Sequence, residues 1–106
     1  AELRQQFYNK VLHREGEAPR VASTDICEQV IKAHLSSNSI LCILSLQDWL
    51  SIDEQWRNPD AQAERINIPA NPRHYWRYRM HITLEQLLKA DSVNRKIIEL
   101  IEKSGR

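Results

Sequence analysis

The sequence predicts a mainly helical chain with one or two short strands, of the kind that closes a larger α/β barrel. Apolar residues recur at helical spacing near both ends of the chain. Residues 40–44 form one continuous apolar run between polar residues, as expected for a strand that is buried on both faces. No second run of this kind is present, so such a strand would need neighbours from outside this chain.

The first helix is predicted from Leu3, Phe7 and Val11, and we expect it to extend to about His13. A second helix is expected to begin near residues 23–25, where Asp25 and Glu28 have capping-box spacing, and to end near residue 35. The chain begins at position 1 directly in the amphipathic pattern, without Met. We therefore expect it to be a piece of a longer polypeptide.

The polar residues 36–39 lead into the expected strand, which we place at about 39–46. Residues 47–79 have no regular pattern, apart from a short helix expected within 49–56. Two helices are predicted to close the chain, at about 83–103. Thr83 and Gln86 have capping-box spacing at the start of the first, and Gly105 is a suitable stop for the second.

Composition limits the classes of protein that fit. The 106 residues are enough for one small domain and too few for two. Cys27 and Cys42 form neither a disulfide framework nor a metal-ligand spacing, and the four histidines lack ligand spacing, so we expect no metal and no cofactor. No secretory leader or long apolar run is present, and we expect a cytoplasmic protein that does not bind membranes.

Positive charge gathers in one part of the chain. The formal net charge is only +1, yet residues 57–81 contain arginines and no lysine, against two acidic residues. Arginine provides planar, forked hydrogen bonding, which suits a specific site better than a diffuse cationic surface. The arginines of this part are Arg57, Arg65, Arg73, Arg77 and Arg79.

Three short blocks occur in order along the chain: Leu46-Gln47-Asp48, then Arg65-x-Asn67-x-Pro69, then Trp76-Arg77-x-Arg79. Together they resemble the C-terminal end of the 4-alpha-glucanotransferases, the family that contains amylomaltase and disproportionating enzyme. The resemblance covers roughly residues 5–103. The proline of the second block is followed by Ala70-Asn71-Pro72 instead of a glycine and a small residue, which is similar to the longer bacterial and the plant cytosolic enzymes of the family.

The resemblance implies a (β/α)8 barrel that cleaves an α-1,4-glucan, holds the glycosyl unit covalently and transfers it to an acceptor sugar. In the family, the carboxylates of this retaining chemistry lie upstream of the region resembled, so no catalytic residue is assigned here. We expect this chain alone to be inactive. Its expected partners are a malto-oligosaccharide or glucan substrate and the remainder of the same polypeptide.

If residues 39–46 are the last barrel strand, residues 47–80 form a long loop on the face where such barrels build their active sites. On this basis we assign Arg65, Asn67, Asn71 and Trp76 to substrate binding. Asparagine amides can bond to sugar hydroxyls, and a tryptophan ring offers an apolar platform for a sugar face.

Each assignment has a structural alternative. The two asparagines could only cap turns, and Trp76 could simply pack. The arginines of the second and third blocks are expected to tie the loop to carboxylates or to main-chain carbonyls, with Asp48 as one candidate partner. Asp48 itself is expected to be a helix N-cap or an arginine partner, and Trp49 and Trp56 are expected in the core.

Two other functions stay open. Residues 73–79 alternate cations with aromatics, a composition that single-stranded nucleic-acid binders use, although the near-neutral net charge and the lack of an RNA-binding signature argue against it. The amphipathic helices could instead form a protein-interaction module. Apolar faces that missing barrel strands would cover also lead us to expect self-association of the isolated chain.

Overall fold

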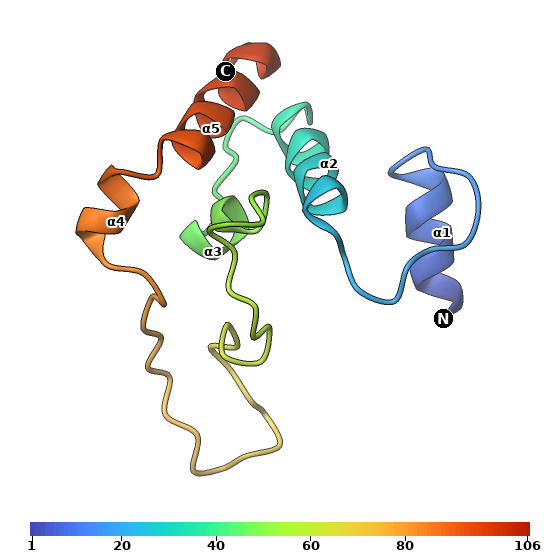
Figure 1. Ribbon diagram of the computed structural model, residues 1–106. Helices are drawn as coiled ribbons and strands as arrows, with labels where there is room; N and C mark the ends of the chain where they lie inside the picture. The colour runs from blue at the N-terminus through green and yellow to red at the C-terminus, as the bar shows by residue number, and fades with distance from the viewer.

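The computed structural model describes residues 1–106 as five helices without any strand (Figure 1). Helices α2 and α5 lie side by side, and α3 packs against α5. Helix α1 stands apart from them, and a long irregular segment leaves α3 and returns to α4 (Figure 1). The helices are α1 (Glu2–Lys10), α2 (Thr24–Leu35), α3 (Leu46–Leu50), α4 (Leu84–Leu88) and α5 (Asp91–Ser104).

The chain is open. Its radius of gyration is 15.4 Å, whereas a compact domain of this length would have about 13 Å. Only 10 of the 106 residues are buried. The hydrophobic core is therefore small, and many large apolar side chains remain in contact with water.

The core lies where α2, α5 and the turn after α3 meet. Six buried residues form one cluster, and partly buried side chains, including those of Trp49 and Trp56, pack against it. The expectation that these two tryptophans belong to the core is confirmed. The six residues are Ile31, Leu35, Ile52, Ala90, Val93 and Leu100.

Local sequence signals set the helix ends. Ser23 is the N-cap of α2, and its hydroxyl accepts a hydrogen bond from the Ile26 N–H at 3.3 Å. This cap stands in place of the capping box expected from Asp25. The capping box expected at α4 is confirmed, because Thr83 and Gln86 bond reciprocally at 2.8 and 3.1 Å. Gly105 ends α5 with φ 75°, as expected of a glycine stop.

Helix α3 begins earlier than expected. It spans Leu46–Leu50, not residues 49–56, because Ser45 and Asp48 form a capping box. The Asp48 carboxylate accepts hydrogen bonds from the Ser45 N–H at 3.0 Å and from its hydroxyl at 2.7 Å. Asp48 thus completes the cap of Ser45 and is neither the N-cap nor an arginine partner, which corrects both expectations.

Helix α1 is shorter than expected, ending at Lys10 rather than near His13, which adopts φ 51°. The segment after α1 is joined to α2 by Arg14. Its guanidinium forms an ion pair with Asp25 and donates through Nε to the Gln29 side chain at 2.8 Å. The hydrogen bond to Asp25 raises the pKa of Arg14.

Arg106 joins the end of the chain to the end of α2. Its guanidinium donates to the main-chain oxygens of Leu35 at 2.6 Å, Ser37 at 2.9 Å and Ser39 at 2.9 Å. Leu35 is the last residue of α2 and the two serines follow it, so no further helical N–H is available to these carbonyls. The contact fixes the start of residues 39–46 next to α5.

The strand expected at residues 39–46 is not formed. Residues 41–45 have no regular secondary structure, and no main-chain N–H or C=O group of residues 40–44 makes a hydrogen bond. Cys42 and Leu44 pack against the core, while Ile40, Leu41 and Ile43 are 95, 75 and 88% exposed. A strand needs a neighbouring strand to satisfy its main chain, and this chain provides none.

Candidate functional site

The first and third sequence blocks meet at Glu64, the residue before the second block. Gln47, from the first block and from α3, donates through Nε2 to the main-chain oxygen of Glu64 at 2.7 Å. Glu64 directly precedes the second block. Tyr78, inside the third block, donates its hydroxyl to the Glu64 carboxylate, with distances of 3.2 Å to Oε2 and 3.5 Å to Oε1. One residue therefore connects segments that are far apart in the sequence.

The Glu64 carboxylate has two further neighbours. Asn58 Nδ2 donates to Oε1 at 2.8 Å, and His81 Nδ1 lies 3.9 Å from the same oxygen. His81 Nε2 contacts the Trp56 carbonyl at 2.8 Å, and because a carbonyl only accepts, this nitrogen carries the proton. The neutral ring thus presents a lone pair to Glu64, and only the protonated ring forms an ion pair with it.

Tyr78 stays a hydrogen-bond donor over a wide pH range. Burial of its ring, together with the negative charge and the hydrogen bond of Glu64, raises the pKa of its hydroxyl, while a hydrogen bond from Gln47 acts in the opposite direction. Each of the raising effects disfavours the phenolate. The protonated hydroxyl can therefore hold the carboxylate.

The residues assigned to substrate binding lie in the segment that leaves Glu64 and returns at Tyr78. Asn67 is exposed and its side chain makes no hydrogen bond within the chain. Trp76 is 73% exposed and does not pack in the core. Both side chains are thus free to meet a ligand, and for Trp76 the packing alternative does not hold.

Asn71 and Arg65 are occupied locally. The Asn71 side-chain oxygen accepts a hydrogen bond from the Arg73 N–H at 3.0 Å, which is the turn-capping alternative. Arg65 donates to the Gln62 side chain at 3.2 Å. The structure therefore brings neither side chain to Glu64.

The partners expected for the arginines of these blocks were wrong. Arg77 lies over the ring of Tyr75, 5.5 Å from its centroid, and forms a cation–π contact. Arg79 makes no hydrogen bond or ion pair, and no arginine contacts Asp48. Of these arginines, only Arg77 lies against an aromatic ring, and that ring belongs to the exposed Tyr75.

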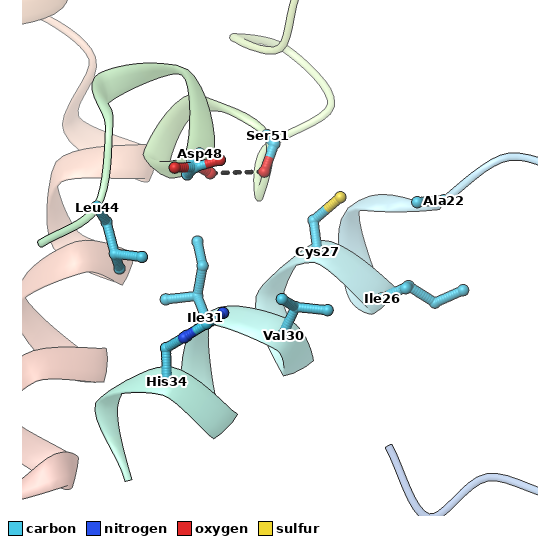
Figure 2. A pocket seen from close by; sticks show the side chains of 9 residues that line it. All are labelled: Ala22, Ile26, Cys27, Val30, Ile31, His34, Leu44, Asp48 and Ser51. Atoms are coloured by element: carbon cyan, nitrogen blue, oxygen red, sulfur yellow. Dashed lines mark hydrogen bonds between the residues drawn. The ribbon is translucent and has the colours of Figure 1, made fainter. Parts of the chain in front are cut away.

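Two hollows border α3, and they differ in character. The first is polar and is formed by α3 and the start of the irregular segment, with Gln47, Arg57, Asn58 and Glu64 among its lining residues. The second lies between α2 and α3 and is mostly apolar (Figure 2). In it, Asp48 and Ser51 lie opposite the α2 side chains, and the Ser51 hydroxyl donates to the Asp48 main-chain oxygen at 2.5 Å. Asp48 lines both hollows, and its carboxylate is used in the cap of α3. The polar hollow is the candidate site because Glu64 lines it, and Glu64 lies at the start of the segment that carries Asn67 and Trp76.

No group of three or more histidine, cysteine, aspartate or glutamate side chains is arranged to hold a metal ion. None of the helices combines the length and the apolar character that crossing a membrane requires.

Comparison with known sequences decides the family. The sequence profile described as 4-alpha-glucanotransferase matches residues 1–85. The chain belongs to the 4-alpha-glucanotransferase family. It is also 36% identical, over 103 residues and 97% of its length, to the 4-alpha-glucanotransferase DPE2 of Oryza sativa subsp. japonica. It spans about 11% of the length of that relative. No solved structure matches the chain significantly.

Sequence reasoning reached the family through the three blocks but missed the residues that connect them. Glu64, Tyr78, Asn58 and His81 were not singled out for a role. A signal was present for the first two, because Glu64 adjoins the second block and Tyr78 occupies the variable position of the third. No local pattern indicates how far apart the two side chains lie, so their contact could not be inferred.

Proposed function

We propose that the complete polypeptide containing this chain transfers α-1,4-glucan segments or glucose between maltodextrins and an acceptor sugar. The observation that carries the proposal is membership of the 4-alpha-glucanotransferase family, and the contacts of Gln47 and Tyr78 with Glu64 support it. In this proposal the present chain supplies part of the glucan-binding surface. The remainder of the polypeptide supplies the catalytic groups.

Three carboxylates of this chain are engaged in structural hydrogen bonds, which supports placing the catalytic groups elsewhere in the polypeptide. Retaining glycosyl transfer requires a nucleophile and an acid about 5 Å apart, on opposite sides of the bond that is cleaved. Asp48 is held in the cap of α3, and Asp53 accepts hydrogen bonds from the Gln55 N–H at 2.9 Å and the Ser92 hydroxyl at 3.0 Å. Glu64 holds Tyr78. We therefore propose that the chain alone is inactive.

The proposed place of the chain is the C-terminal end of a (β/α)8 barrel. In this arrangement residues 39–46 form the last strand, residues 47–80 form the loop on the active-site face, and residues 83–103 form the closing helices. The direction of the side chains supports it, because Cys42 and Leu44 pack inward on the helices while Ile43 and Leu41 point away. The unpaired main chain of residues 40–44 offers both edges to neighbouring strands.

Asn67 and Trp76 are the proposed glucan contacts. A tryptophan ring that is 73% exposed presents an apolar face on which a sugar ring can stack, and an exposed amide provides both a donor and an acceptor for hydroxyl groups. Arg65 and Asn71 are proposed to support them from within the loop. The free thiols of Cys27 and Cys42 fit the reducing environment of the cytoplasm, where we place the enzyme.

The test is to express the complete reading frame, assay maltotriose disproportionation, and replace Asn67 or Trp76 by alanine. We expect KM for maltotriose to rise about tenfold in each variant, the amount that one lost hydrogen bond or stacking contact produces. Asn38→Ala and Leu3→Ala are the controls, because both residues are exposed and lie outside the loop. Wild-type KM and turnover in both loop variants would refute the assignment.

A further inference from the structure

The irregular segment has a base at which its two ends come together. Glu64 and Tyr78 are 14 residues apart in sequence, and the hydroxyl of one contacts the carboxylate of the other. Residues 65–77, here called the glucan loop, lie between them. We infer that Glu64 is a positioning residue for glucan binding, and that with Tyr78 it closes the base of the glucan loop and fixes its orientation. This inference rests on the proposed function.

Beyond this base, the glucan loop has no hydrogen bond to a helix, and its only other bonds to residues outside it are those of Arg65 to the nearby Gln62. His74 Nε2 contacts the Ile66 carbonyl at 2.9 Å, and the Asn71 N–H donates to the Ile68 carbonyl at 2.9 Å, so these bonds remain inside the loop. Arg65 reaches back only to Gln62. No hydrogen bond or ion pair of residues 65–77 reaches a helix. The orientation of the loop is consequently set at its base.

The base is connected to the rigid part of the molecule through α3. Gln47, on α3, donates to the Glu64 main-chain oxygen at 2.7 Å. The same helix buries Leu50, which is 2% exposed, and leads directly into Ile52, which is completely buried. A continuous path therefore runs from the core through α3 and Glu64 to Tyr78, and it holds both ends of the loop.

The negative charge of the Glu64 carboxylate strengthens the hydrogen bonds that close the base of the loop. Glu64 accepts from two donors on different parts of the chain, Asn58 and Tyr78, and hydrogen bonds to a charged acceptor are about twice as strong as neutral ones. The side chain of Glu64 is 23% exposed, so its contacts are only partly open to competing water. Glutamine at this position would keep an acceptor oxygen but lose the charge.

The inference predicts a particular kinetic signature. The glucan loop carries the proposed sugar contacts, while the catalytic carboxylates belong to another part of the polypeptide. Releasing the loop should therefore weaken glucan binding without changing the chemical step, and so raise KM while kcat remains near wild type. A purely structural role would instead lower the melting temperature of the enzyme and leave KM for the folded fraction unchanged.

The experiment uses the complete polypeptide, with Tyr78→Phe, Glu64→Gln and the double variant. We expect Tyr78→Phe to raise KM for maltotriose about tenfold, the consequence of one lost charge-assisted hydrogen bond. We expect a smaller rise in Glu64→Gln, which keeps an acceptor oxygen but loses the charge. Because both changes act on the same contact, the double variant should show about the KM of Tyr78→Phe and not the product of the two effects. Tyr8→Phe and Glu28→Gln are the matched controls on α1 and α2, and both should retain wild-type KM.

Limited trypsin digestion gives a second readout that does not depend on activity. The glucan loop contains Arg73 and Arg77, both exposed, and cleavage after them should be several-fold faster in the two variants than in wild type and the controls. An inactive wild-type enzyme would refute the proposed function, whereas faster loop cleavage in the variants would still support closure by Glu64 and Tyr78. Wild-type KM together with wild-type cleavage rates in both variants would overturn the inference.

Discussion

Replacing Ile52 by alanine tests whether the small core is located where the structure places it. Ile52 follows α3, is 0% exposed and belongs to the cluster formed with α2 and α5. The substitution removes three carbon atoms, which at about 0.8 kcal/mol for each buried group amounts to about 2.4 kcal/mol of transfer free energy. The cavity left behind adds to this loss, so we expect about 3 to 4 kcal/mol in the free energy of unfolding.

The measurement is urea unfolding of the 106-residue chain, followed by the circular dichroism of its helices. With a denaturant slope of about 1.5 kcal/mol per molar, the expected loss lowers the unfolding midpoint by about 2 M. A small protein with few buried residues has little stability in reserve, so the variant could already be largely unfolded in water. Ile52→Val then provides a milder change, with an expected loss of about 1 kcal/mol.

The matched control is Ile98→Ala, on α5, where the side chain is 56% exposed. Its expected cost is below about 1 kcal/mol, because most of the removed surface already contacts water. If Ile52→Ala lowers the midpoint no further than Ile98→Ala, the junction of α2, α3 and α5 is not the core, and the reasoning about how α3 is anchored fails.

Two further predictions concern the loop base and the exposed apolar segment. The pKa of the Tyr78 hydroxyl should lie above the ordinary tyrosine value of 10.0, and Glu64→Gln should lower it. The titration of Tyr78 alone is obtained by subtracting the ultraviolet titration of Tyr78→Phe from that of wild type. Because folding raises the pKa of Tyr78, its protonated hydroxyl contributes its full stability below pH 10, and this contribution is lost as the pH rises through the pKa in the folded state. A Tyr78 that titrates with an ordinary pKa would contradict the Glu64 contact. The isolated chain should self-associate through Ile43 and its neighbours, and Ile43→Lys should reduce this in sedimentation, since a charged side chain hinders pairing between exposed main-chain edges. A wild-type chain that stays monomeric at high concentration would exclude this surface as a contact.

Sequence reasoning was most accurate where a few neighbouring residues determine the result. The cap at Thr83 and the stop at Gly105 were predicted because each depends on residues within one helical turn. The core position of Trp49 and Trp56 also followed from their apolar character. The start of α3 was missed, although Ser45 and Asp48 carry the same kind of local signal as the box at α4.

Residues 39–46 show the limit of such reasoning. Their continuous apolar character was interpreted as a strand, but a strand exists only when other strands supply hydrogen bonds, and none is available in this chain. Part of the apolar run is still used in packing, because the alternate side chains Cys42 and Leu44 pack against the core. In the proposed barrel, the rest of the polypeptide would cover the side chains of Leu41 and Ile43, which are exposed on the other side.

The sequence by itself determined the family, the cap of α4, the stop of α5 and the segment that carries the proposed glucan contacts. Only the tertiary structure decided that Glu64 meets Gln47 and Tyr78, that Trp76 is exposed, and that Asn71 is used in a turn. The difference has a physical cause. Helix caps depend on contacts between residues three or four positions apart, whereas the loop base depends on where the main chain returns after 14 residues, and that path is fixed by packing elsewhere in the molecule.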